Sequence, residues 1–302
     1  MIAVLISMKV ASIEHEGCTS WAAIGDALDP NIRSSKVILH KNRDMSDTHT
    51  MDIREIDNGA YTYLAIAGHN KDSSNTTDDN LLVWAGVNEA GLAAASNYVG
   101  GINLFGTRGG ASFCREILEN CDSVDSAYAY ISKNKSKFYS GNLIFLADPH
   151  KIAVIEAKVW LFGAVKISSK SDSVVDGSVE NPNILYRSNH YIHLTNYIPL
   201  PASDDTMARY TRLTSLMDNT AGSLYGLIDV QQSRAVSRLE NNAGNDAFCK
   251  TSTLARITIE IDRANPLASI IWYGPGYDES REDGDHCTDD AGSLMAYTFY
   301  QK

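Results

Sequence analysis

The stretch Glu16-Gly-Cys-Thr-Ser-Trp21 begins a run of strand-forming residues and places a glycine directly before Cys18. A cysteine reacts as its thiolate, and a free thiol with a pKa near ~8.5 needs help to reach that form at neutral pH. If the chain is cut before Cys18, the new α-amino group, with a pKa near ~8, is a base beside the thiol. We therefore predict a nucleophile at Cys18, with Gly17 leaving room for the thiol to attack its carbonyl. Taken alone, the stretch also fits a half-buried cysteine in an ordinary strand.

Around this stretch, the first half of the chain is rich in short runs of strand-forming residues. These runs are residues 19–25, 36–41, 61–67, 81–86 and 91–98. The last two flank Val87-Asn-Glu-Ala90, which predicts a hairpin turn. A second hairpin is predicted from residues 143–146 and 153–157, with its turn at Asp148-Pro-His-Lys151.

Apolar residues recur every three or four positions from residue 112 to residue 134, which predicts one long helix that covers a sheet. Further helices are expected at residues 206–217 and 226–239, an exposed polar loop at residues 168–183, and strands at residues 255–261 and 268–272. Hairpins dominate and no alternation of parallel strands with helices is present. We therefore expect an α+β fold in which two mainly antiparallel sheets pack together with helices outside, a four-layer αββα sandwich.

The composition indicates a soluble single-domain protein. The 302 residues are 44% hydrophobic, and no apolar run approaches the ~20 residues that cross a bilayer. A formal net charge of -11 repels phosphate backbones and anionic lipids, so we expect neither nucleic acid nor membrane as a partner. The sequence leaves a homo-oligomer open.

Cysteine usage favours a reducing cytoplasm, with secretion left open. The five cysteines form neither a CxxC pair nor a zinc-binding spacing, and the histidines show no HExxH or HxH pattern. We therefore expect no metal and no cofactor. The first residues lack the basic segment of a secretory signal, and His15 stands where a lipoprotein signal needs an apolar residue.

Five motifs occur in an order that resembles a known family. They are Gly17-Cys-Thr-Ser20, Lys41-Asn-Arg-Asp44, Trp84-Ala-Gly-Val-Asn-Glu-Ala-Gly-Leu92, Ser96-Asn-Tyr98 and Ser188-Asn-His-Tyr191. Together they resemble the acyl-CoA:6-aminopenicillanic acid acyltransferase-like family of N-terminal-nucleophile (Ntn) hydrolases. Choloylglycine hydrolases and penicillin V acylases are related to that family. The resemblance runs from Cys18 to about Gly276. It implies a leader, residues 1–17, removed by autoproteolysis between Gly17 and Cys18, and a single Ntn-hydrolase domain, residues 18–302.

The resemblance also implies the catalytic residues. Cys18 would cut the precursor and carry the acyl group as a thioester, and Asp44 would hydrogen-bond the new α-amino group. The backbone N–H of Asn97 and the side-chain amide of Asn189 would form the oxyanion hole. Arg209 would support the centre through its guanidinium, although Arg212 lies one helical turn away and the sequence does not decide between them.

Other residues near these motifs have weaker assignments. Lys41 stands where the bile-salt branch of the superfamily has an arginine, and a cation there would depress the thiol pKa. Lys41 is also a candidate for the substrate pocket. Trp21 and Tyr98 are further pocket candidates, because they are close in sequence to the nucleophile and to the oxyanion hole. His190 is expected to be structural or to line the pocket. Other positions expected to lie outside the site are Asn88, Glu89, Gly91, Leu92, Asp148 and Glu156.

The sequence therefore predicts an autoprocessed cysteine hydrolase of a linear, non-peptide carbon–nitrogen amide bond. Its substrate would be a small acyl amide. Acyl transfer, in which an amine or a CoA thiol replaces water and acyl-CoA is a substrate, remains an alternative within the same mechanism. A thioesterase-like or lactone-opening activity is a smaller alternative, and a non-catalytic relative that never cuts the Gly17–Cys18 bond is an alternative of another class.

Overall fold

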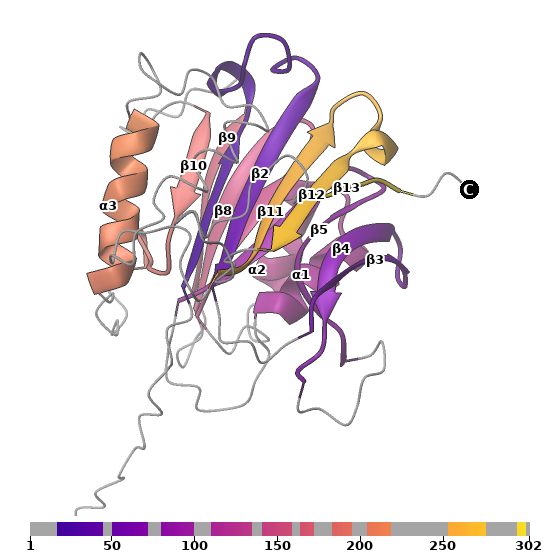
Figure 1. The fold of residues 1–302 in the computed structure, drawn as a ribbon, viewed down its shortest axis with the longest axis horizontal. Helices are drawn as coiled ribbons and strands as arrows, with labels where there is room; N and C mark the ends of the chain where they lie inside the picture. The colour runs from indigo at the N-terminus through magenta and orange to yellow at the C-terminus, as the bar shows by residue number, and fades with distance from the viewer. Residues whose placement is uncertain are drawn as a thin grey trace, which may run out of the picture.

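The structure, a computed structural model, describes ten segments of the chain. These are residues 17–44, 50–71, 80–99, 110–134, 141–158, 164–171, 183–194, 204–218, 253–275 and 295–299. Within them the strands form two sheets, one of six strands and one of seven, and every paired strand is antiparallel (Figure 1).

The six-stranded sheet has the order β10-β1-β2-β11-β12-β13. Its strands are β1 (Cys18–Ala23), β2 (Lys36–Asp44), β10 (Ile184–Arg187), β11 (Thr253–Asp262), β12 (Ile270–Pro275) and β13 (Met295–Tyr297). Strand β2 lies between β1 and β11, and its residues from Val37 to Asp44 are all buried, the polar ones included. The lysine, arginine and aspartate of the motif Lys41-Asn-Arg-Asp44 are therefore buried in the middle of this sheet.

The seven-stranded sheet follows the chain in order from β3 to β9. Its strands are β3 (Asp52–Asp57), β4 (Thr62–Gly68), β5 (Leu82–Asn88), β6 (Ala93–Tyr98), β7 (Asn142–Ala147), β8 (Lys151–Lys158) and β9 (Ala164–Ser171). Gly91 adopts a φ of +88° in the turn between β5 and β6, a conformation that favours glycine. Strands β5 and β6 pair with each other, as do β7 and β8, which confirms both predicted hairpins.

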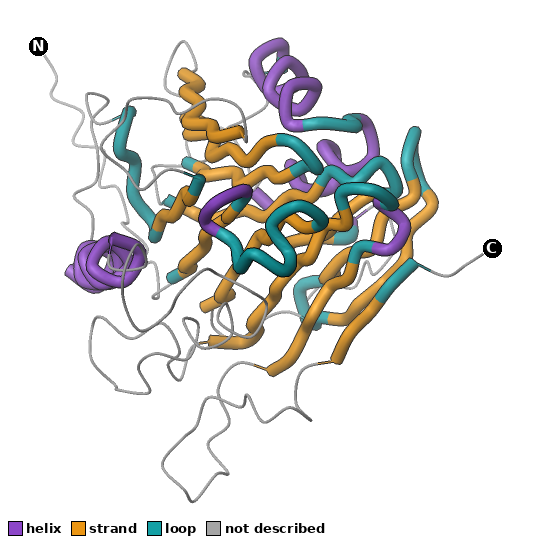
Figure 2. The backbone as a smooth tube through the Cα atoms, turned by 90° about the horizontal axis from the view of Figure 1, so that it is seen from above, coloured by secondary structure: helices purple, strands orange, loops and turns teal. Residues whose placement is uncertain are grey.

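The apolar residues form three clusters that define four layers. The first lies between the two sheets and joins residues such as Leu39 and Ile257 to Trp84 and Phe145. The second lies between the seven-stranded sheet and two helices, α1 (Gly110–Asn120) and α2 (Val124–Lys133). The third lies between the six-stranded sheet and α3 (Asp204–Asp218), where Leu213 packs. The helices thus lie on opposite sides of the paired sheets (Figure 2), as the predicted αββα sandwich requires.

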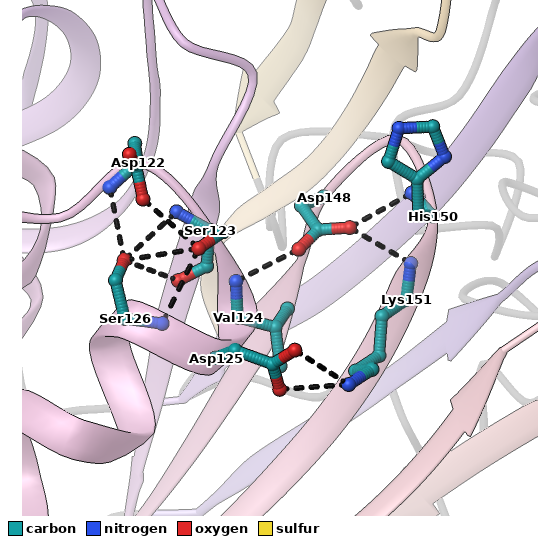
Figure 3. A network of polar contacts seen from close by, with 8 residues as sticks. All are labelled: Asp122, Ser123, Val124, Asp125, Ser126, Asp148, His150 and Lys151. Carbon is teal, nitrogen blue, oxygen red and sulfur yellow. Dashed lines mark hydrogen bonds and ion pairs between the residues drawn. The ribbon is translucent and has the colours of Figure 1, made fainter.

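The prediction of one helix from residue 112 to residue 134 is wrong. Helix α1 ends at Asn120, and Ser123 caps the N-terminus of α2 in a capping box with Ser126. Asp148, in the hairpin turn after β7, accepts a hydrogen bond of 2.8 Å from the N–H of Val124 (Figure 3). The apolar period continues across the break because both helices face the same sheet. The local capping residues decide the geometry.

Other predicted elements agree with the structure only in part. Residues 168–171 belong to β9, so the predicted loop over residues 168–183 is wrong there, and residues 172–182 lie outside the described residues. The helix expected at residues 206–217 is α3, whereas that expected at residues 226–239 lies outside the described part. Of the strands expected at residues 255–261 and 268–272, the first is β11, and the second starts later, at Ile270, as β12.

Asn88 connects the β5–β6 turn to the end of α1. Its side-chain N–H₂ donates to the carbonyls of Leu118 (3.0 Å) and Cys121 (2.7 Å), and its Oδ1 accepts the N–H of Leu92 at 3.0 Å. Asn88→Ala would leave these backbone groups unsatisfied, and we expect it to lower the free energy of unfolding by about 1–3 kcal/mol or more.

Urea unfolding of the two proteins measures this loss. Asn120→Ala is the control, because its exposed side chain bonds a single carbonyl at the surface, and it should change stability by less than ~0.5 kcal/mol. Equal losses in the two variants would contradict the assigned role of Asn88.

Candidate active site

Cys18 is the first residue of β1 and is 1% exposed. In the register of β1 on β2 it lies opposite Arg43, and Ser20 lies opposite Lys41. Directly opposed residues of an antiparallel pair point to the same face. These four side chains therefore face the seven-stranded sheet, where Ser20 Oγ and Lys41 Nζ both donate to Asn97 Oδ1, at 2.8 Å and 3.1 Å.

The backbone nitrogen of Cys18 is held by a buried amide. Its N–H donates to Asn189 Oδ1 at 2.7 Å, and Arg209 Nη2 donates to the same oxygen at 2.9 Å. Because both neighbours are donors, the oxygen of the Asn189 amide must face them. Its Nδ2 donates in turn to the carbonyl of Tyr98, at 2.6 Å. Residues 171 positions apart thus meet at one peptide nitrogen.

Arg209 is the arginine of α3 that reaches Cys18. It is fully buried, and its Nη1 donates to the carbonyl of Cys18 (2.8 Å) and to Thr19 Oγ1 (2.9 Å). Arg212, one turn further along the helix, is partly exposed. The choice that the sequence left open therefore falls on Arg209.

Two cations lie beside the thiol. Arg43 Nη1 is 4.0 Å from Cys18 Sγ, and Lys41, itself fully buried, is its other cationic neighbour. Burial alone raises the pKa of the Cys18 thiol. The charges of Lys41 and Arg43 outweigh that effect and hold the pKa below its ordinary value. By contrast, burial raises the pKa of Cys114 to about 12 and that of Cys121 to about 11. Among these three described cysteines, Cys18 alone has an environment that favours the thiolate.

Sequence reasoning missed Arg43 and Trp84. The guanidinium of Arg43 lies over the Trp84 ring, 5.1 Å from its centroid. The alternation of side chains along a strand could have revealed Arg43, because it stands two residues after Lys41 on the same face. Trp84 belongs to the other sheet, and only the fold brings it there.

Asp44 lies next to Gly17 at the end of β2. Its backbone N–H donates to the carbonyl of Gly17 at 2.8 Å. A Cβ added to Gly17 would lie 3.0 Å from Asp44 Oδ2 and 3.1 Å from Arg209 Nη2. A side chain at this position would therefore have to displace the carboxylate or the guanidinium by a few tenths of an ångström. The role predicted for Asp44, orienting a free α-amino group, stays a prediction.

The side chain of Asn97 is fixed between the two sheets. Its Nδ2 donates to the carbonyl of Ser188 at 3.2 Å, while its oxygen receives the bonds from Ser20 and Lys41. The segments of Asn97 and Asn189 thus bond each other directly, because Asn189 Nδ2 donates in return to the carbonyl of Tyr98. Their predicted oxyanion roles also stay predictions.

The aromatic and histidine candidates have different positions. Trp21 is fully buried on the opposite face of β1 from the thiol and stacks on His40, with ring centroids 3.8 Å apart. We therefore leave Trp21 out of the proposed site. Tyr98 contributes its carbonyl to Asn189. His190 packs edge-on against Tyr210, and burial together with Arg187 and Arg209 lowers its pKa to about 4.

The described residues include no group of three or more His, Cys, Asp or Glu side chains placed to hold a metal ion. In the same residues, the helices are too short or too polar to span a bilayer.

Comparison with known proteins shows the family of this chain. The family model of acyl-coenzyme A:6-aminopenicillanic acid acyl-transferase matches residues 33–275, well over half of the chain. The chain belongs to this family. A search of curated protein sequences gives no significant match.

Two solved structures are similar to this acyl-transferase family member. A mutant of conjugated bile acid hydrolase from Clostridium perfringens has a TM-score of 0.50 at 12% identity, covering 94% of this chain and 97% of that one. Penicillin V acylase from Agrobacterium tumefaciens has a TM-score of 0.41 at 16% identity, with 85% and 83% covered. The bile acid hydrolase shows the fold, which is that of an Ntn hydrolase. The family match shows that the protein is an enzyme of the acyl-transferase family.

The cations beside the thiol give a testable pH dependence. Arg43→Met removes a positive charge 4.0 Å from Sγ, which raises the pKa of Cys18 and leaves less thiolate at neutral pH. We expect the pH profile for alkylation of Cys18 by iodoacetamide to move to higher pH. The rate at pH 7 should fall about threefold or more.

Arg33→Met is the matched control, because Arg33 is exposed and pairs with Asp26. Labelling is read by peptide mass spectrometry, which separates Cys18 from the other cysteines. An unchanged pH profile in Arg43→Met would show that this guanidinium does not act on the thiol.

Proposed function

We propose that this protein is an autoprocessed cysteine amidohydrolase that cleaves a linear, non-peptide amide through a thioester on Cys18. One observation carries the proposal. At Cys18, dedicated polar groups surround both atoms that the chemistry needs: Asn189 holds the backbone nitrogen, and Arg43 and Lys41 favour the thiolate. No such environment surrounds the described thiols of Cys114 and Cys121.

The first step is self-cleavage. Cys18 Sγ attacks the carbonyl carbon of Gly17, a carbon–sulfur bond forms, and the Gly17–Cys18 carbon–nitrogen bond breaks as the nitrogen takes up a proton. Water then hydrolyses the thioester, which leaves a carboxylate on Gly17 and a free thiol and amine on Cys18. The bond from the Asp44 N–H to the Gly17 carbonyl and the lack of a side chain at Gly17 support this step.

Turnover uses the same sulfur with a new base. The α-amino group of Cys18 accepts the thiol proton, and the thiolate attacks the acyl carbon of R–CO–NH–R′. The amine leaves with that proton, and water hydrolyses the thioester to R–COOH. In this scheme Asp44 orients the amine, and Asn97 N–H and Asn189 Nδ2 receive the oxyanion, each donor contributing a few kcal/mol of barrier lowering. Asn189 must then release the Tyr98 carbonyl that its Nδ2 now holds.

Acyl transfer is the second candidate, favoured by the family match to an acyl-coenzyme A:6-aminopenicillanic acid acyl-transferase. The thioester is the same, and an amine acceptor takes the place of water. When acyl-CoA is the donor, its own thioester replaces the amide as the group that Cys18 attacks.

The decisive test is Cys18→Ala. We expect it to abolish both cleavage and turnover, because it removes the only atom that forms the thioester. Wild-type protein is screened with penicillin V, a conjugated bile salt and N-acyl amino acids, with and without an amine acceptor. An acyl adduct on Cys18 is then trapped by acid quenching and read by mass spectrometry.

Cys114→Ala and Cys121→Ala serve as controls, because these buried thiols pack behind the seven-stranded sheet. Both should retain cleavage and turnover. Full turnover by Cys18→Ala would exclude the proposed mechanism, and a wild-type chain that neither cleaves nor turns over any of the probes would indicate a non-catalytic relative.

A further inference from the structure

Glu156 is a fully buried carboxylate that the proposed chemistry does not use. It lies in β8 of the seven-stranded sheet. Its Oε1 accepts the N–H of Ile192 at 2.8 Å, and its Oε2 accepts the N–H groups of His193 and Leu194, both at 2.9 Å. Three consecutive backbone N–H groups therefore converge on one side chain from the other half of the sandwich.

A second bond from the same strand secures this segment. The hydroxyl of Tyr191 donates to the carbonyl of Ala157 at 2.7 Å. On the other side of Asn189, the side chain of Asn97 donates to the carbonyl of Ser188. Asn189 is thus attached before and after to the seven-stranded sheet, although the strand that leads into it, β10, belongs to the six-stranded sheet.

The hydrogen bonds to Glu156 fix the position of the bonded segment more than they increase the stability of the fold. Burying a carboxylate costs free energy that its hydrogen bonds offset, and an apolar side chain of similar size often serves the fold as well. An ion pair of 3.9 Å with the buried Nε of Arg187 contributes to that offset. Three bonds to successive N–H groups, however, fix where a segment runs, which apolar packing does not.

We propose that Glu156 is a positioning residue that holds residues 188–194 across the two sheets and thereby sets the place of the Asn189 amide at Cys18. The inference rests on the proposed function, in which Asn189 acts on the nitrogen of Cys18 and on the oxyanion. A displacement of about 1 Å at such a group costs up to about 100-fold in rate.

The test is Glu156→Gln, which keeps the size of the side chain but turns one acceptor into a donor that faces an N–H group. Hydrogen–deuterium exchange should become faster in residues 188–194. On the best probe amide, kcat per titrated Cys18 should fall about tenfold or more with KM little changed, because the lost interaction belongs to the transition state.

Asp148→Asn is the matched control. Asp148 is also a buried carboxylate in a hairpin of the same sheet, and it accepts three backbone N–H groups, those of Val124, His150 and Lys151, each at 2.8 Å (Figure 3). The Asp148→Asn variant should be less stable and should show faster hydrogen–deuterium exchange around α2, while kcat per titrated Cys18 stays unchanged. Tyr191→Phe loosens the proposed segment without changing a charge, and it keeps the test open if Glu156→Gln fails to fold.

The outcomes separate the two proposals. Faster exchange at residues 188–194 with an unchanged kcat in Glu156→Gln or Tyr191→Phe would overturn the positioning role. An equal loss of kcat in Asp148→Asn would overturn it too, since general loosening would then explain the effect. A wild-type protein without turnover or cleavage would instead refute the proposed function. The comparison of wild type with Cys18→Ala tests that function independently of Glu156.

Discussion

The antiparallel register of β1 on β2 is the constraint on which the site depends. It places Cys18 opposite Arg43 and Ser20 opposite Lys41, so that the thiol and both cations share the face between the sheets. The same register puts the Gly17 carbonyl against the N–H of Asp44. A slip of one residue would turn the thiol to the other face and separate it from both cations. The reactive environment is therefore a consequence of strand pairing rather than of a flexible loop.

The layers around this pair then assemble groups from distant parts of the chain. Helix α3 brings Arg209 to the carbonyl of Cys18, and the segment after β10 brings Asn189 to its nitrogen. Strand β6 supplies Asn97 from the opposite sheet, where Ser20 and Lys41 bind it. Each of these polar groups is buried and hydrogen-bonded to another. These bonds offset the free-energy cost of burying polar and charged groups between the sheets.

Much of the fold could be predicted from the sequence, because alternation and turn residues are local signals. The hairpin at Asp148 is an example. The strands that escaped prediction carry weak signals. Strand β3 is rich in charged residues, β9 ends in a run rich in serine, and β10 and β13 have only four and three residues. The break before α2 escaped because two helices that face one sheet share an apolar period.

The site was less predictable, since its parts lie up to 191 residues apart in the chain. The motifs at Cys18, Asp44 and Asn189 were found through their order, and only the structure shows which groups they contact. Arg43 was within reach of strand alternation. The contacts of Glu156 were not, because its partners are backbone N–H groups that any sequence would offer.

The most direct test of the central claim is the intact mass of the purified wild-type chain, read beside that of Cys18→Ala. The account predicts a wild-type species that begins at Cys18 and a variant that keeps residues 1–17. A wild-type chain that stays full length after prolonged incubation, or a Cys18→Ala chain cut at the same bond, would contradict it.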